Sequence, residues 1–156
     1  MTLRPVLKNP NDLLRTKAKK VPVALIQSLE VQTLIDDLTE TMNIENGVGI
    51  AATQIGSDKR VIIIDVNGVM PLVNPEIVSK SLRKIEFEEG CLSVPGVTGI
   101  VKRHRAITLK AHDRHGKILT IKAKGLLAIV LQHETDHING ILFIDKVIRY
   151  TNPPLM

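Results

Sequence analysis

Aromatic side chains are almost absent from this chain: its 156 residues include no tryptophan, one tyrosine and two phenylalanines. The core must therefore consist of isoleucine, leucine and valine, and stacking of nucleic-acid bases on aromatic side chains has little support. The composition is otherwise that of a globular protein, because 44% of the residues are apolar and 24% are charged, which argues against disorder.

Cysteine is also scarce. Cys91 is the only one, so the chain cannot form an internal disulfide, and a reducing compartment fits. The N-terminus lacks the apolar core of a signal peptide, and no apolar stretch reaches the roughly 20 residues of a membrane span. We therefore expect a soluble protein of the bacterial cytoplasm, or one that is processed after import into an organelle. Nothing in the sequence predicts a membrane partner or specific binding to DNA.

Positive charge is in modest excess, with a formal net charge of +5. Lysines and arginines are spread along the chain, and the densest basic segments are Lys17–Lys20 and Lys102–Arg105. Such runs are usually solvated surface, and the alternative is attraction to an anionic partner such as ribosomal RNA.

The length of the chain fits one domain that can bury a sizeable core. No repeat, linker or low-complexity segment interrupts it, and we expect a single α+β domain over residues 1–150. Residues 151–156 contain two prolines and are expected to form a loose tail.

Two helices are predicted before residue 50. The first is short, roughly residues 12–18, with Asn11 or Asp12 as its cap, and the second covers about residues 24–43. Apolar residues of the second helix recur at three- and four-residue steps and predict one buried stripe: Val31, Leu34, Ile35, Leu38 and Met42. The acidic residues expected to face water are Asp36, Asp37 and Glu40.

The middle of the chain reads as strands, namely residues 60–66, 69–73, 77–89, 106–111 and 117–122. Asn67-Gly68 predicts a tight hairpin between the first two, and Pro71 places the return strand at an edge or a bulge. We expect Asn74-Pro75 to form a turn.

The most informative stretch is the motif Gln132–His137, which follows the apolar run Leu126–Leu131. If one helix continues through both, His133 and His137 lie one turn apart on the same face. Two neutral imidazoles at this spacing can bind one divalent metal, and the neighbouring Glu134 can move protons beside it. The alternative is the polar end of a core helix with a solvated glutamate.

The apolar approach favours the metal site over that alternative. Leu126, Ile129 and Val130 project from the same side as the two histidines, so the imidazoles should leave a buried face. We expect this helix to run from about residue 125 to residue 138, with Asn139-Gly140 as its cap.

A catalytic metal site usually has three protein ligands, so two histidines leave one ligand to be found. A lone cysteine is more often a small buried hydrophobe than a ligand, but Cys91 lies in a glycine-flanked segment where a thiolate could approach a metal. A thiolate is a strong ligand for zinc or iron(II). The remaining histidines show no ligand-like spacing and are expected at the surface: His104, His112 and His115.

The segment Gly47–Gly56 is rich in glycine and alanine, so the backbone there can approach another group closely. It is not a phosphate-binding loop, because the lysine and hydroxyl residue of a Walker motif are missing and Ala52 takes the place of the third glycine. Gln54 is its only strongly polar side chain. The alternative is a tight turn with Gln54 in solvent.

Three segments, Gly47–Gln54, Glu89–Ser93 and Gln132–His137, stand in this order, and together they resemble the signature motifs of the peptide deformylase family. The resemblance covers nearly the whole chain. It implies a metal-dependent hydrolase that removes the N-formyl group from the initiator methionine of new polypeptides and releases formate. It also implies an α+β fold in which mostly antiparallel strands pack around one long metal-binding helix.

The resemblance assigns roles to individual residues. The metal ligands would be Cys91, His133 and His137, the general acid/base Glu134, and the groups that stabilise the oxyanion Gln54 and the backbone N–H of Leu92. The region of Gly49 would hold the substrate backbone as an added strand. The pocket for the methionine side chain would be lined by Val48, Phe87, Leu126, Ile129 and Val130.

The resemblance implies iron(II) as the metal, although one thiolate and two imidazoles also suit zinc, nickel or cobalt. The partners it implies are N-formylmethionyl nascent peptides. Ile50 stands where leucine is commoner in the family, and this exchange should be tolerated. The chain ends soon after the metal helix, without the C-terminal helix with which many bacterial members dock on the ribosome, so ribosome binding is a weaker expectation.

Two other function classes remain open. A zinc metalloprotease also uses H-E-x-x-H but usually takes its third ligand downstream, where this chain offers only Asp145 as a carboxylate and no histidine. A non-catalytic basic domain that binds RNA or the ribosome would need a metal site closed by a fourth protein ligand. The sequence offers no second cysteine and no other histidine of suitable spacing for that site.

Overall fold

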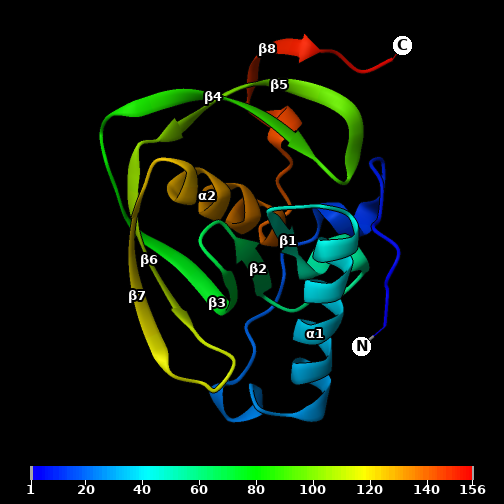
Figure 1. Cartoon of the computed structure of the whole chain (residues 1–156), viewed down its shortest axis with the longest axis vertical. Coiled ribbons are helices and arrows are strands. Elements are labelled where there is room, and N and C mark those ends of the chain that lie inside the picture. Colours follow the sequence, from blue (N-terminus) through cyan, green and yellow to red (C-terminus); the bar gives the residue numbers. More distant parts are fainter. Residues whose placement is uncertain (1, 156) are drawn as a thin grey trace.

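The computed structural model describes residues 2–155, and within them it contains two α-helices and eight strands (Figure 1). The helices are α1 (Leu29–Ile44) and α2 (Leu126–Ile138). The strands are β1 (Gly49–Ala51), β2 (Val61–Asp65), β3 (Val69–Lys80), β4 (Lys84–Cys91), β5 (Val94–His104), β6 (Ala106–His112), β7 (Ile118–Lys124) and β8 (Val147–Asn152). Short 3-10 helices are η1 (Asp12–Arg15), η2 (Val23–Leu25), η3 (Ala52–Ile55) and η4 (Phe143–Asp145).

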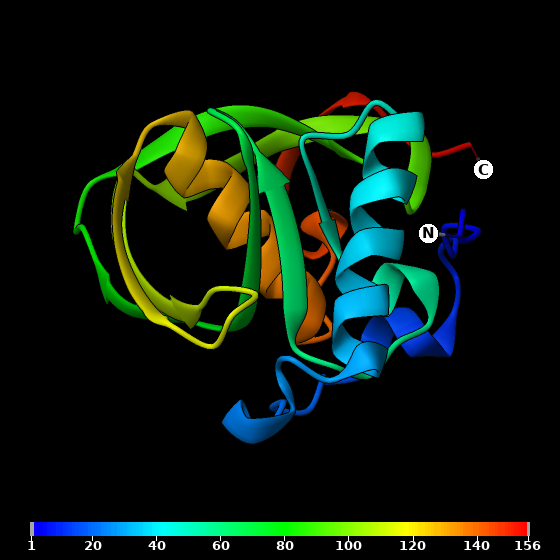
Figure 2. The same cartoon turned by 60° about the horizontal axis from the view of Figure 1, so that its bottom comes forward.

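The strands form two sheets, one in the order β1-β2-β3-β6-β7 and one in the order β4-β5-β8. Within each sheet, every pair of neighbouring strands is antiparallel. Helix α2 runs between the two sheets, whereas α1 lies beside β1 and β2 (Figures 1 and 2). The predicted α+β fold, with antiparallel strands around the helix that carries H-E-x-x-H, is therefore confirmed.

Helix α1 begins later than the sequence predicts. Residues 23–25 form the separate turn η2, and Ser28 caps α1 by accepting a hydrogen bond from the N–H of Val31. The predicted apolar stripe is buried, and it packs on β1 and β2. The expectation that Asp37 faces water is wrong, because the N-terminal segment covers its side chain. There Asp37 accepts a hydrogen bond from the N–H of Thr2 and pairs with Arg4.

The expected turn at Asn74-Pro75 is also wrong, because both residues lie inside β3. The strand changes partner there, pairing with β2 up to Val73 and with β6 beyond it, through a bulge. Asn74 takes a positive φ of 52°, and its side chain holds the backbone of Val21 through two hydrogen bonds of 2.8 Å. Pro71 pairs with β2 only, in the half of β3 that has no second neighbour.

Helix α2 follows the prediction closely. It starts after Gly125 and ends at Ile138, and Gly140 turns the chain with a φ of 77°. Its apolar residues pack on β2, β3 and β6, so the helix is held at the centre of the molecule. No helix among residues 2–155 is both long and apolar enough to span a bilayer.

The end of the chain differs from the expected loose tail. Residues 151 and 152 belong to β8, which pairs with β5, while residues 153–155 have no regular secondary structure. Leu142 and Phe143 pack under β5. Met1 and Met156, at the ends of the predicted domain and tail, lie outside the described residues.

The turn after α2 gives a stability test. A Cβ on Gly140 would collide with the carbonyl oxygen of Arg15, whereas Gly116 has a similar φ of 89° with open space around it. Gly116→Ala should lower the free energy of unfolding by about 1–2 kcal/mol, the cost of a left-handed alanine. Gly140→Ala should lower the free energy of unfolding clearly more than Gly116→Ala does. Equal losses of unfolding free energy in the two variants, measured by urea unfolding, would contradict the close contact between Gly140 and Arg15.

Candidate metal centre and substrate cavity

Three potential metal ligands converge where the end of β4 meets α2. Cys91 is the last residue of β4, and His133 and His137 stand one turn apart on α2. The Sγ of Cys91 lies 3.2 Å from Nε2 of His137, and the ligand atoms of all three residues lie within 4.8 Å of one another. The structure therefore brings together the cysteine and the two histidines that the sequence singles out.

The chemistry of this set fits a divalent metal. Nδ1 of His133 lies 2.8 Å from a carboxylate oxygen of Glu89, so this nitrogen carries the proton and Nε2 keeps its lone pair. The N–H of Ser93 and the amide of Gln54 both point at the sulfur of Cys91, at 3.5 and 3.6 Å, which suits a thiolate. One thiolate and two imidazoles match zinc or iron(II). Within residues 2–155 the cluster has no fourth protein ligand.

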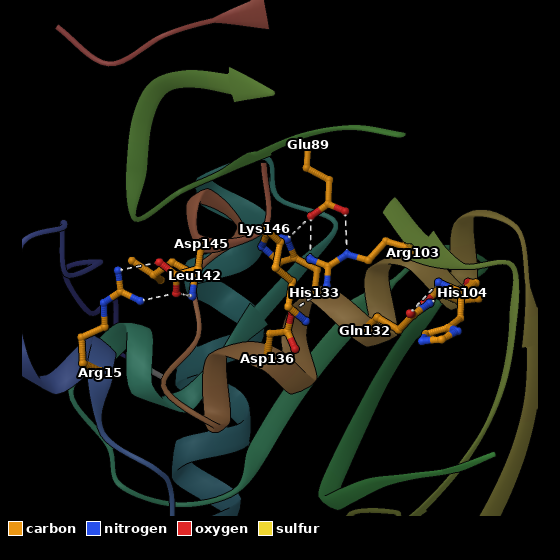
Figure 3. Close-up of polar contacts among 11 residues, drawn as sticks. Arg15, Glu89, Arg103, His104, Gln132, His133, Asp136, Leu142, Asp145 and Lys146 are labelled. Atoms are coloured by element: carbon orange, nitrogen blue, oxygen red, sulfur yellow. Dashed lines mark hydrogen bonds and ion pairs between the residues drawn. The ribbon is translucent and has the colours of Figure 1, made fainter. Parts of the chain in front are cut away.

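Glu89 joins this cluster to a buried ion network (Figure 3). Both of its oxygens accept hydrogen bonds from Arg103, at 2.8 and 2.9 Å, and Arg103 also donates to Asp136 at 2.6 Å. Burial alone would raise the pKa of Glu89, but the hydrogen bonds and charges of Arg103 and His133 outweigh it and lower the pKa to about 2. Glu89 therefore stays ionised and holds the His133 ring in place.

No motif or spacing in the sequence predicts a role for Glu89 or Arg103. Glu89 is in the glycine-flanked segment with Cys91, and that position is the one signal that could have drawn notice to it. Arg103 is only 2% exposed, although it lies in a basic segment expected to be solvated surface.

Glu134 is the second carboxylate of the site, and its surroundings are different. It is buried, and its Oε2 has no hydrogen-bond partner among the described residues. Burial raises its pKa to about 7. A carboxyl group with such a pKa can both accept and return a proton near neutral pH. Gly49 lies so close to it that a Cβ there would come within 2.5 Å of Oε1.

Gln54 points inward and is 1% exposed, so the alternative of a solvent-facing turn is wrong. Its Oε1 accepts a hydrogen bond from the N–H of Ala51 at 2.9 Å, which fixes the orientation of the amide. Its Nε2 donates to Ser93 at 3.1 Å and points toward Cys91. The amide N–H groups therefore face the metal cluster.

A cavity of about 520 Å³ opens beside this cluster. It is lined by every residue to which the family resemblance gives a role in substrate or oxyanion binding: Val48, Gly49, Gln54, Phe87, Leu92, Leu126, Ile129 and Val130. Cys91, His133 and Glu134 also line it, whereas His137 does not. Its wall is mostly apolar and includes a few polar groups, which is typical of a small-molecule or peptide site.

The other histidines lie apart from the cluster. His115 is exposed, as expected. His104 and His112 are half-buried rather than free at the surface, and Nδ1 of His104 bonds to the carbonyl oxygen of Ser81 at 2.7 Å. None of them belongs to the ligand cluster found in residues 2–155.

Comparison with known proteins identifies the same family throughout. A family model described as Polypeptide deformylase matches residues 3–152. A peptide deformylase of Acetivibrio thermocellus is 48% identical over 151 residues, which cover 96% of this chain and 86% of the relative. These matches confirm the resemblance that the three motifs predicted.

Solved structures agree with the sequence relatives. A crystal structure of a peptide deformylase from Legionella pneumophila is 46% identical with a TM-score of 0.88, and the match covers 94% of this chain and 86% of that chain. The Met-Ala-Ser-bound class I type b peptide deformylase from Acinetobacter baumannii is 36% identical with a TM-score of 0.90, covering 94% and 100% of the two chains.

The buried network gives a second stability test. Arg103→Met would leave the ionised Glu89 without its main partner, and removing one member of a buried pair typically costs about 3–5 kcal/mol. Arg114→Met is the matched control, because Arg114 pairs with Asp36 at 3.0 Å on the surface, where such a pair contributes about 0–1 kcal/mol. Equal losses of unfolding free energy in the two variants would contradict this account of Glu89.

Proposed function

The chain belongs to the polypeptide deformylase family, and we propose that Cys91, His133 and His137 hold the divalent metal on which its activity depends. It is a hydrolase of the deformylase type, acting on the N-formyl group of nascent peptides. The observation that carries the assignment of residues is that these ligand atoms lie within 4.8 Å of one another, and that Cys91, His133 and Glu134 line one cavity.

The proposed ion is iron(II), with zinc, nickel and cobalt as the other ions that suit this donor set. Held by Cys91, His133 and His137, a divalent ion would supply a Lewis acid that polarises a carbonyl and lowers the pKa of water. Supporting the proposal, Glu89 holds the proton of His133 on Nδ1, so that the ring presents a lone pair to the cluster.

Glu134 is the proposed proton carrier. Its raised pKa of about 7 and its unpartnered Oε2 allow it to accept the proton of the attacking water and to pass it to the departing amine. The carboxyl group of Glu134 occupies space that is free because Gly49 has no side chain, and any larger residue at position 49 would displace it.

Gln54 and Leu92 are proposed to stabilise the negative charge that develops on the formyl oxygen. The amide of Gln54 is fixed by Ala51, so its N–H groups need little rearrangement when charge appears. Leu92 is the residue after Cys91, and both residues line the cavity. Loss of one such donor typically lowers the rate by roughly 10²–10³.

The substrate is proposed to bind as an extended strand with its methionine in the apolar part of the cavity. Both β1 and β4 stand at the ends of their sheets, so each has a backbone edge that a peptide can pair with. The side chains proposed to surround methionine are Val48, Phe87, Leu126, Ile129 and Val130. A tripeptide, Met-Ala-Ser, is bound in a structurally similar deformylase, which supports this choice of substrate.

The crowding of Gly49 against Glu134 also supports selectivity for formyl over acetyl groups. A formyl carbon bears only hydrogen, whereas the methyl group of an acetyl carbon would need additional room beside Gly49 and Glu134, which already stand close together. The proposed substrates arise where ribosomes start chains with formylmethionine, so the proposal places the enzyme in the bacterial cytoplasm or in an organelle.

The direct test is release of formate from formyl-Met-Ala-Ser by protein loaded anaerobically with iron(II). Glu134→Gln keeps the shape of the side chain but removes the proton carrier, so the rate should fall by about 10²–10⁴ while the bound metal per chain stays unchanged. An active variant would overturn the role of Glu134. Acetyl-Met-Ala-Ser is the matched substrate, and comparable hydrolysis of both peptides would overturn the proposed selectivity.

A further inference from the structure

Two hollows adjoin on the side of α2 away from the catalytic cavity, and lysines line both of them. The first has a volume of about 510 Å³ and lies over β6 and β7, where it is lined by Lys80, Lys122 and Lys124. The second has a volume of about 420 Å³ and is lined by Lys80, Lys84, Lys102, Arg103 and Lys146. The two hollows share Lys80, so they lie next to each other, and we call the pair the basic groove.

The positive charge of the groove is largely uncompensated. Asp136 is the only carboxylate among its lining residues, and it already pairs with Arg103 at 2.6 Å and with Lys146 at 2.9 Å. The other groove lysines are exposed and form no ion pair within residues 2–155; they are Lys80, Lys84, Lys102, Lys122 and Lys124. A polyanion laid along the groove would supply the missing charge.

We propose that the basic groove binds the phosphodiester backbone of RNA. Two adjoining hollows with several separate ammonium groups suit a chain of phosphates better than one small anion. The chain has no tryptophan and one tyrosine, so the binding is electrostatic and indifferent to base sequence. An anionic membrane is the less suitable partner, because among the described residues that line the groove Ile148 is the only large apolar one that is exposed, so there is little apolar surface to insert into lipid.

The position of the groove is compatible with catalysis. On helix α2, Gln132 and Asp136 line the groove, whereas His133 and Glu134 line the catalytic cavity. RNA bound in the groove would therefore leave the mouth of the cavity open to a peptide. Binding at this site does not depend on the metal or on Glu134, so it stands or falls separately from the proposed hydrolysis.

The test is fluorescence anisotropy of a labelled single-stranded RNA across a series of salt concentrations. The groove variant is Lys80→Gln, Lys84→Gln, Lys102→Gln, and the control is Lys17→Gln, Lys20→Gln, Lys117→Gln, which removes the same charge from exposed lysines elsewhere. The groove variant should raise Kd by at least about tenfold and flatten the slope of log K against log salt by about 2, or about 0.7 per lost phosphate contact. The control should bind nearly as tightly as the unaltered protein.

Both variants should melt like the unaltered protein and release formate at the same rate, since none of these lysines touches the catalytic cavity. Equal weakening by the two variants would overturn the proposal, because the attraction would then come from net charge alone. Absence of RNA binding at physiological salt, with binding to phosphatidylglycerol vesicles instead, would also overturn it.

Discussion

The hydrogen bond that Glu89 accepts from His133 is the interaction on which the site depends. It joins β4 to α2, and these two elements carry all three candidate metal ligands. Cys91 is two residues beyond Glu89 on the same strand, so fixing Glu89 against the helix also fixes the sulfur near the histidines. Arg103 holds Glu89 from β5, and Asp136 returns the network to α2 (Figure 3). A single closed set of contacts thereby sets the distance between strand and helix.

The site contains two buried carboxylates that the protein keeps in different states. Arg103 and His133 hold the pKa of Glu89 near 2, whereas burial without a partner raises the pKa of Glu134 to about 7. One carboxyl group is thus a fixed negative charge that orients the ring of His133, and the other can exchange a proton near neutral pH, as the proposed role of Glu134 requires. Different surroundings give the same chemical group two functions, which is how active sites separate structural from catalytic acids.

The sequence predicts the parts of this structure that depend on local pattern. The apolar stripe of α1, the helix through His133 and His137, and the cavity lining all lie where periodicity or the motifs place them. The failures involve contacts between distant segments. Asn74-Pro75 has the composition of a turn, yet it becomes a bulge because β3 exchanges one partner strand for another. Asp37 is buried because the N-terminal segment lies over it.

Arg103 shows the same limit at the active site. Its neighbours in the sequence are basic and suggest a solvated surface, and only the fold reveals that Arg103 is buried against Glu89 while Lys102 is exposed. Alternation along β5 accounts for this division, because successive side chains of a strand point to opposite faces. Arg103 is therefore buried against Glu89 and Asp136 whereas Lys102 is exposed, although both residues line the second hollow of the groove.

The central claim is that one sulfur and two imidazole nitrogens hold the metal, with no fourth protein ligand. X-ray absorption spectroscopy of the zinc- or iron-loaded protein tests this most directly. The account predicts a first coordination shell with a single sulfur, two imidazoles and a remaining exchangeable light-atom ligand, and loss of the sulfur in Cys91→Ala. A shell without sulfur, or one closed by four protein ligands, would contradict the assignment of Cys91, His133 and His137.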